Sequence, residues 1–295
     1  MKTYVNDSGT FKEAKRVYIK DSGTWKEVNK IFVNDAGTWK QAFANELVLT
    51  VSTTVTNYDL YAQAVSAYGS STLPPYIKLV VASGGTIGGN AGSLSTWGSG
   101  AYLIYNSNSS DPYYSTLYSN GRWGLKGATG LVVSNSFAAG TTITIQVNSG
   151  GAIYAGAGCG GISGTFCGNP NYRYGGDGGD AIQVQGAYTV NVTNAGYIYG
   201  GGGGGAGAPN DVYCDARRYG GVGYGYETQI AASVGTGPLA AFGSSGTGGY
   251  GGGWASAGGN NSSGNSYGGA AGAAINNTGG ATVSVTNTGT ILGSY

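Results

Sequence analysis

Histidine is absent from this 295-residue sequence, and charged side chains of both signs are scarce. Without histidine the chain cannot build a Ser-His-Asp or Cys-His catalytic arrangement, nor any imidazole-based metal site. Charged residues make up 9% of the sequence and the net charge is +1, unlike the basic balance of nucleic-acid-binding proteins. No apolar run approaches the roughly 20 residues of a membrane-spanning helix. We therefore expect no nucleic-acid partner, no membrane insertion, no metal and no cofactor.

Cysteine is also rare, and its three residues all lie in the second half of the chain: Cys159, Cys167 and Cys214. Cys159 and Cys167 flank one polar segment, and a disulfide bond would rigidify it outside the cell. Free thiols fit the spacing equally well, so the sequence leaves the pairing open. The start of the chain lacks the apolar core of a secretory signal peptide, so we expect synthesis in a cytosol.

Glycine and aromatic residues are what the chain has in abundance. The 60 glycines lie mostly after residue 150, and they are about three times as frequent as the usual ~7%. Low charge and high glycine are typical of disorder, but 24 tyrosines, 5 tryptophans and 6 phenylalanines argue against it. We therefore expect an ordered chain.

One strand–turn–strand unit occurs three times in the sequence. The segment Thr189–Gly200 aligns without gaps with Thr282–Gly293 and with Thr144–Ala155. Ile182 and Ile275 stand at the same distance before the first two copies. The alternating apolar residues of each copy predict a half-buried β-strand. We interpret this unit as a structural module and expect the function to reside in the segments between its copies.

Residues 1–45 contain a different repeat, which begins at Tyr4, Tyr18 and Phe32. Each copy places Asp-x-Gly between two alternating runs, which predicts three β-hairpins with glycine supplying a positive φ. One face of the hairpins carries aromatic residues and the other carries lysines: Phe11, Trp25 and Trp39, against Lys12, Lys26 and Lys40. The aromatic face either packs within the protein or attaches the chain to a carrier protein.

Residues 46–149 predict a β-rich connector domain with the chain's one short helix. Leu47 to Val51 alternate as a strand, and period two returns from Ile77 to Val81. Between them, apolar residues at helical spacing predict a helix that Asn57 caps and that ends before Gly69.

Residues 150–295 predict a glycine-rich domain. Its glycine clusters repeat at three-residue spacing, as in Gly175/Gly178 and Gly248/Gly251. Three residues per turn is the period of the polyproline II helix, and close approach of such helices requires glycine. We therefore predict a mainly β protein with a bundle of polyglycine II helices and very little α-helix. Hydrogen bonds between neighbouring segments of the chain would offset the conformational entropy that ordered glycine loses.

These glycine clusters, broken by polar and aromatic loops, resemble the distal tail-fibre adhesins of T-even-type bacteriophages. The closing run 268–275 followed by 286–293 is similar to the C-terminal part of those adhesins. The resemblance covers roughly residues 46–295. It implies a polyglycine II sandwich that holds loops against a bacterial receptor, and therefore a location at the virion tail-fibre tip. The 14-residue repeats depart from the T-even pattern.

Four loops, 159–174, 209–226, 231–242 and 254–267, would form the binding surface. They are rich in Tyr, Trp, Arg and Asn, the residues that dominate recognition surfaces. The alternative for any one tyrosine is packing on the glycine-rich surface, and Arg217-Arg218 fits an ion-pair cluster as well as a ligand clamp. The candidate receptor-binding residues are Phe166, Tyr172, Arg173, Tyr174, Asp211, Tyr213, Asp215, Arg217, Arg218, Tyr219, Tyr224, Tyr226, Trp254, Asn261 and Tyr267.

The expected function is a non-enzymatic adhesin that binds an outer-membrane protein or a surface glycan. The expected second partner is a tail-fibre or tail-tip protein, held through the N-terminal repeats. Asp177 and Asp180 could meet as a carboxylate pair of the kind that glycosidases use, and so could Asp211, Asp215 and Glu227. Asp177 and Asp180 sit inside a glycine motif, where a structural role is favoured. The alternatives are a tail-spike-type polysaccharide depolymerase and a glycine-rich structural or ice-binding protein.

Overall fold

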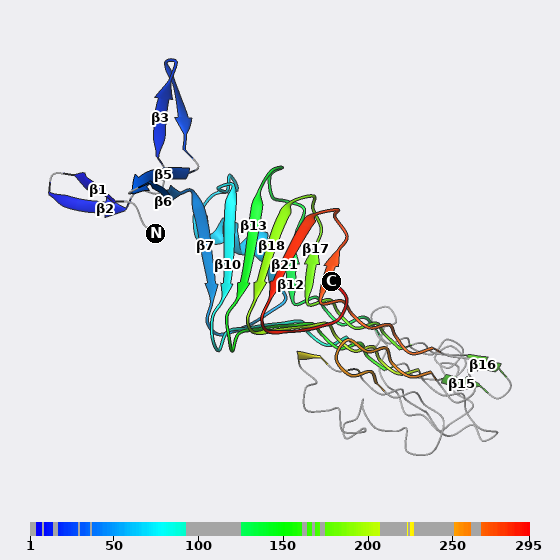
Figure 1. The fold of residues 1–295 in the computed structure, drawn as a ribbon. Helices are drawn as coiled ribbons and strands as arrows, with labels where there is room; N and C mark the ends of the chain where they lie inside the picture. The colour runs from blue at the N-terminus through cyan, green and yellow to red at the C-terminus, as the bar shows by residue number, and fades with distance from the viewer. Residues whose placement is uncertain are drawn as a thin grey trace.

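The computed structural model is mainly β, with one short helix among the residues that it describes (Figure 1). This confirms the predicted class at that level. The described residues are 4–7, 9–13, 17–28, 30–35, 37–92, 125–160, 164–166, 169–171, 175–206, 223, 225–226, 251–260 and 267–295.

Three separate antiparallel strand pairs come first in the chain. They are β1 (Tyr4–Asp7) with β2 (Thr10–Glu13), β3 (Tyr18–Asp21) with β4 (Thr24–Glu27), and β5 (Lys30–Asp35) with β6 (Thr38–Ala44). Their turns contain Gly9, Gly23 and Gly37 at φ of 86°, 85° and 85°, the left-handed region that glycine enters without steric cost. Trp25 is 65% exposed, and the Lys20 Nζ lies 5.9 Å from its ring centroid.

The following strands form three parallel sheets that share one core. The first sheet holds β7 (Glu46–Val51), β10 (Tyr76–Val81), β13 (Thr142–Val147), β18 (Thr189–Asn194) and β21 (Thr282–Asn287). The second holds β8 (Thr54–Thr56), β11 (Thr86–Gly88), β14 (Ala152–Tyr154), β19 (Tyr197–Tyr199) and β22 (Thr290–Leu292). The third holds β9 (Tyr58–Asp59), β12 (Leu131–Val133), β17 (Ile182–Val184) and β20 (Ile275–Asn277).

The chain visits the three sheets in turn and then repeats, so the architecture is a three-sided parallel β-helix. We call each circuit a rung. Alternate residues of each strand point into the core, as period two requires, and Ile145, Val190 and Ile198 are fully buried there. The sequence repeat therefore reflects successive rungs stacked on one another.

The pairing corrects one detail of the repeat. Thr142, not Thr144, lies beside Thr189, whereas Ile153 does lie beside Ile198 as aligned. The ungapped alignment fails in the first strand because the connection 148–151 is longer than its counterpart 195–196. Strands from both sides of the expected boundary at residues 149–150 belong to the same three sheets.

The helix α1 (Leu60–Tyr68) ends before Gly69 as predicted, but its N-cap is Asp59 and not Asn57. The Asp59 carboxylate accepts hydrogen bonds from the Tyr61 and Ala62 backbone N–H groups, at 2.9 and 3.1 Å. These are the first-turn donors that a helix cannot satisfy itself. Asn57 instead turns the corner of the first rung at φ 50°, and its side chain accepts from the Asn90 N–H.

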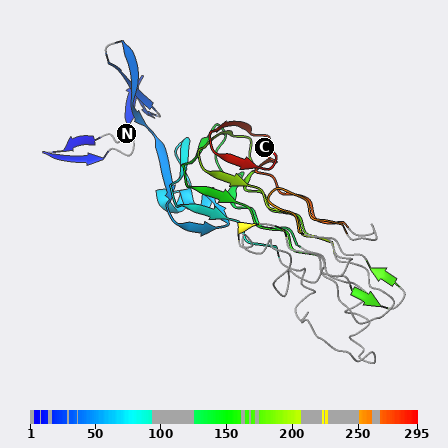
Figure 2. The ribbon, with the colours of Figure 1, turned by 60° about the horizontal axis from the view of Figure 1, so that its bottom comes forward.

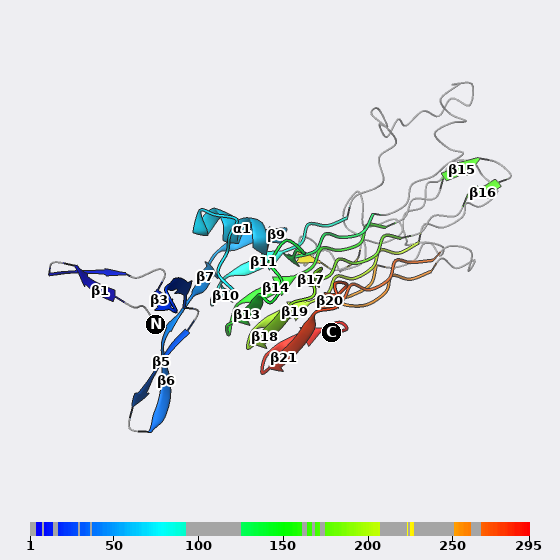
Figure 3. The same ribbon diagram turned by 90° about the horizontal axis from the view of Figure 1, so that it is seen from above.

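An aromatic ladder fills the corner between the third sheet and the first. The Tyr61 and Phe137 rings are 5.1 Å apart, and the Phe137 and Tyr188 rings are 5.8 Å apart, both edge to face. The Tyr188 hydroxyl also donates to the Phe137 carbonyl oxygen at 3.1 Å. Figure 3 shows α1 beside this part of the β-helix. Each residue comes from a different rung, so the ladder holds three rungs together.

Candidate functional site

The glycine-rich parts of the chain are excursions from one corner of the β-helix. The first rung passes from its second sheet to its third through Asn57 alone. The next three rungs leave that corner for residues 89–130, 155–181 and 200–274 before they return. The described segments of these excursions run side by side away from the sheets, as Figures 1 and 2 show. We call the described segments 89–92, 125–130, 155–160, 175–181, 200–206, 256–260 and 267–274 the glycine segments, and together the glycine bundle.

Hydrogen bonds in the glycine bundle follow a three-residue period. Gly201 and Gly204 donate to the carbonyl oxygens of Gly179 and Gly176, at 3.0 and 2.8 Å. The carbonyl oxygens of the same two glycines accept from Gly272 and Gly269, both at 2.8 Å. Gly203 and Ala206 donate instead to a third segment, at Ser256 and Gly259. Residues three apart thus share a neighbour, and each segment is bonded on several sides.

Glycine is required in this bundle because neighbouring backbones occupy the space of a side chain. A Cβ atom on Gly272 would overlap the Gly179 carbonyl oxygen, and one on Gly156 would overlap the Asn90 carbonyl oxygen. Gly201 and Gly204 meet the same obstacle from Gly156 and Cys159. The requirement is close approach of backbones, which explains why the clusters contain so few other residues.

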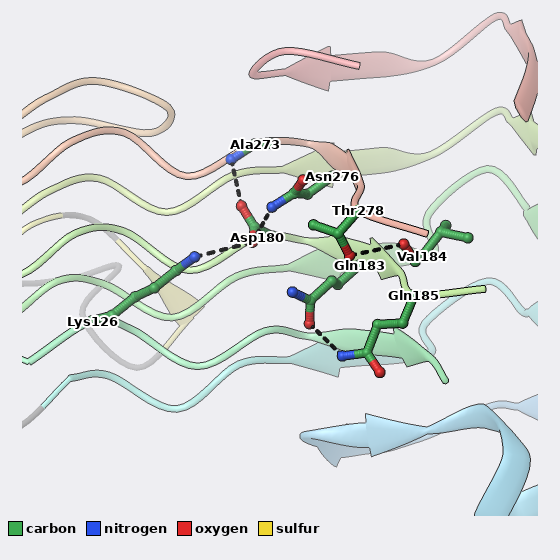
Figure 4. Close-up of polar contacts among 8 residues, drawn as sticks. All are labelled: Lys126, Asp180, Gln183, Val184, Gln185, Ala273, Asn276 and Thr278. Atoms are coloured by element: carbon green, nitrogen blue, oxygen red, sulfur yellow. Dashed lines mark hydrogen bonds and ion pairs between the residues drawn. The ribbon is translucent and has the colours of Figure 1, made fainter. Parts of the chain in front are cut away.

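Asp177 and Asp180 attach two returning segments to each other. The Asp177 carboxylate accepts from the Ala270 N–H at 2.7 Å, and the Asp180 carboxylate accepts from the Ala273 N–H at 3.0 Å. Asp180 is 3% exposed and also accepts from the Lys126 Nζ at 3.1 Å and the Asn276 Nδ2 at 3.0 Å (Figure 4). Its charge is therefore neutralised and hydrogen-bonded, as burial of a carboxylate requires. The three-residue spacing of the two aspartates matches the period of the bundle.

A second aromatic cluster lies where the bundle meets the β-helix. Tyr154 and Tyr199 are neighbours on β14 and β19 with rings 5.4 Å apart. The Trp254 ring lies 5.2 and 5.3 Å from them. Burial raises the pKa of both tyrosines, and the neighbouring tyrosines add to the effect. The Tyr226 ring occupies the space above Gly88, the residue next to Tyr154 in the sheet.

The predicted receptor-binding residues fall into four groups. Tyr226 and Trp254 lie at the base of the bundle, against the β-helix. Tyr267 begins a returning segment at the opposite end, which we call the free end, and is 56% exposed. Phe166 ends β15 (Gly164–Phe166), which pairs with β16 (Asn169–Asn171), and only its backbone is described. The others lie outside the described residues: Tyr172, Arg173, Tyr174, Asp211, Tyr213, Asp215, Arg217, Arg218, Tyr219, Tyr224 and Asn261.

The described residues include one of the three cysteines, and they hold neither a metal-binding cluster nor a membrane-spanning helix. Cys159 is a buried free thiol, while Cys167 and Cys214 lie outside the described residues. In the described ranges, no three His, Cys, Asp or Glu residues are grouped closely enough to hold a metal ion. No helix in the same ranges is both long and apolar enough to cross a membrane.

The sequence did not predict the contacts of Asp180 with Lys126 and Asn276, which we call the Asp180 clasp. These residues are far apart in the chain, and no local pattern joins them. The second aromatic cluster did leave a signal in the sequence. Tyr154 and Tyr199 occupy the same position in two copies of the repeat.

Residues 46–295 match the family of the phage tail fibre adhesin Gp38. The chain belongs to this family. The match begins where the β-helix begins and covers the whole glycine bundle, but it does not include the N-terminal strand pairs. Membership identifies the chain as a phage tail-fibre adhesin, a virion protein that binds a host cell-surface receptor. No curated protein sequence and no solved structure matches the chain.

Proposed function

We propose that this adhesin binds its bacterial receptor through the loops at the free end of the glycine bundle. One observation carries the proposal: all three excursions leave the same corner of the β-helix, and their described segments are hydrogen-bonded to one another. The loops that join the distal ends of these described segments are therefore proposed to lie at the end farthest from the sheets. Binding residues are commonly carried on loops that a rigid scaffold positions, so little conformational change on binding is expected.

We further infer that the glycine segments are polyglycine II helices similar to those of the T-even-type adhesins. A three-fold helix directs successive N–H groups to different sides. The alternation of partners along Gly201, Gly203 and Gly204 supports this assignment. The glycines that admit no Cβ atom support it too, because only glycine allows three-fold helices to approach this closely.

The candidate contact residues are the tyrosines, arginines and asparagines of the loops that follow residues 160, 206 and 260. Tyr267 at the free end belongs with them, because more than half of its surface is exposed. Tyr226 and Trp254 are assigned instead to the junction of the bundle with the β-helix. The receptor class is an outer-membrane protein or a surface glycan, since aromatic and amide side chains recognise both.

The N-terminal repeats are proposed to attach the chain to a tail-fibre or tail-tip protein. The predicted attachment residues are Phe11, Trp25 and Trp39. The exposed Trp25 and the 55% exposed Ile19 lie on opposite faces of the β3–β4 pair. Large apolar side chains exposed on a two-stranded sheet are typical of a surface that a partner covers.

The two alternative functions gain no specific support. Asp177 and Asp180 are engaged by backbone N–H groups, which favours a structural role over glycoside cleavage. An ice-binding protein would present a flat, repetitive face. The outward residues at one register position of the first sheet instead differ in charge and size: Val48, Lys78, Thr144, Asn191 and Ser284.

The test is binding of the labelled chain to a panel of bacterial strains. In one variant, residues 211–222 are replaced by a Gly-Ser linker of equal length, which leaves Gly223–Tyr226 on the bundle. We expect the wild type to bind selected strains and the loop variant to lose binding, with an unchanged circular dichroism spectrum.

Trp254→Ala is the matched control, because it removes an aromatic residue at the base of the bundle rather than at its free end. It should bind like the wild type. Loop-variant binding equal to wild type would exclude 211–222 as the contact loop. Loss of binding in Trp254→Ala alone would move the site to the base.

A further inference from the structure

The last rung of the β-helix leaves a strand edge unpaired. In the described sheets β21 pairs only with β18, and β22 pairs only with β19. We call the outer side of β21 and β22 the terminal edge. Val190, Val192 and Ile198 of the preceding rung are at most 1% exposed. Their counterparts on the terminal edge, Val283, Val285 and Ile291, are only partly buried, although they continue the same apolar core.

In the part of the chain that the structure describes, the terminal edge has none of the usual protection against pairing with another chain. Soluble proteins guard exposed edges with charged residues, proline or a covering element. Residues 274–295 contain no Lys, Arg, Asp, Glu or Pro. The opposite end of the β-helix differs, because α1 packs against β7 and β9 there and Glu46 begins the edge strand.

The hydrogen-bonding groups of the terminal edge point outward in a defined pattern. Thr282 and Thr288 donate their N–H groups toward β18, to Tyr188 and Asn194. Because N–H direction alternates along a strand, the N–H groups of Val283, Val285 and Asn287 face away from β18. They are unpaired by any strand in the described sheets.

An asparagine side chain continues this pattern. Asn194 is fully buried and donates to the Asn287 Oδ1 at 2.8 Å and to the Thr290 carbonyl oxygen at 3.2 Å. Asn287 holds the same register position one rung later. Its Oδ1 accepts from the Gly289 N–H as the Asn194 Oδ1 accepts from Gly196. Its Nδ2 meets no acceptor in the described part of the chain, so it is free to donate to a further rung.

We propose that the terminal edge binds a β-strand of a separate polypeptide, added parallel to β21. The register of the existing rungs defines that strand. It has apolar residues opposite Val283 and Val285 and an amide or carbonyl acceptor opposite Asn287. The edge is uncharged, so the matching strand is also uncharged at these positions. Strand addition of this kind takes its affinity from main-chain hydrogen bonds and its specificity from alternate side chains.

The probe is a synthetic peptide with the sequence of residues 189–199, the rung that already stacks on this geometry. Hydrogen exchange is followed on the full chain with and without the peptide. We expect the amides of Val283, Val285 and Asn287 to exchange at least about tenfold more slowly with peptide bound, and the β7 amides to be unchanged. Equal protection of both edges, or no protection at all, would overturn the proposal.

Two peptide analogues make the test independent of variant folding. N-methylation at the residue corresponding to Asn191 blocks an N–H that faces β21 in the proposed register. N-methylation at the residue corresponding to Val192 blocks one that faces away. The first analogue should lose protection and the second should keep it; equal behaviour of the two would contradict parallel in-register pairing.

Two chain variants test the same edge from the protein side. Val285→Pro removes an N–H that no internal bond uses, while Val285→Ala removes side-chain volume but keeps the N–H. We expect loss of peptide binding only in the proline variant. Equal loss in both would show that the apolar contact and not the main-chain ladder carries binding. Sedimentation that reveals self-association of the chain through this edge would assign the site to a second copy and overturn the separate partner.

Discussion

Gly272 illustrates how a single missing side chain maintains the glycine bundle. A Cβ atom there would overlap the Gly179 carbonyl oxygen, and backbone cannot move aside as a flexible side chain does. Overpacking of this kind costs about 1–3 kcal/mol, so Gly272→Ala should lower the free energy of unfolding by that amount. Thermal or denaturant unfolding measures it.

Gly253→Ala is the matched control for this prediction. The nearest atom to a Cβ on Gly253 is the Ser256 Oγ at 4.0 Å, which is an ordinary contact. The control should unfold like the wild type. A Gly272→Ala variant that is equally stable would show that the segments have room to separate.

The Cys159 thiol should be chemically inert in the folded chain. Burial raises its pKa to about 11, and only the thiolate reacts with alkylating agents. Near neutral pH we expect iodoacetamide to modify Cys159 in denaturant but not in the native protein, with peptide mass spectrometry distinguishing it from Cys167 and Cys214. Fast native modification would contradict the burial.

At the scale of elements, the aromatic ladder predicts how strongly the rungs are joined. Phe137 is 5% exposed and contacts aromatic rings from two other rungs. Phe137→Ala should lower the free energy of unfolding by about 3–5 kcal/mol. Tyr188→Phe removes only the hydroxyl bond to the Phe137 carbonyl oxygen and should cost about 0.5–1.5 kcal/mol. If Tyr188→Phe lost more unfolding free energy than Phe137→Ala, the hydrogen bond and not the ring packing would account for the stabilisation.

The buried tyrosines of β9, β14 and β19 predict a loss of stability in alkali. Burial raises the pKa of Tyr58, Tyr154 and Tyr199 in the folded chain. A raised folded pKa means that folding favours the protonated phenol. This stabilisation is complete below the unfolded pKa of about 10 and is lost as the pH rises through the folded pKa.

Thermal unfolding midpoints measured on both sides of this range test the sign. We expect the midpoint to fall with rising pH, together with tyrosinate absorbance that appears later than in the denatured chain. Tyrosines that titrate identically in the native and denatured chain would contradict the prediction.

At the scale of the whole molecule, the β-helix and the glycine bundle should unfold together. Each excursion is covalently inserted within a rung, and its described segments include ones that are hydrogen-bonded to other rungs, so neither part can open alone without breaking the other's bonds. Hydrogen exchange should therefore give the amides of Gly201 and Gly204 the same opening free energy as those of Val190 and Ile198. Faster exchange confined to the glycines would show two independent units.

The sequence predicted the features that local pattern encodes. The alternation of Val190 and Val192, the C-terminal end of the helix at Gly69 and the three-residue spacing of glycine each depend on residues close together in the chain. The closed three-sided shape was not predicted, because strands such as Tyr58–Asp59 are too short to show a period. The Asp180 clasp was not predicted because its partners lie 54 and 96 residues away.

The three-residue period also has a genetic consequence. A deletion of one residue from 200–206 would rotate every later N–H group by about a third of a turn, toward a neighbour that offers it no acceptor. Loss or gain of three residues would restore the partners. Natural variants of this chain are therefore expected to differ in length by multiples of three residues within the glycine segments. Within the loops any difference in length is expected, because host range can change there without shifting the hydrogen-bond register of the glycine bundle.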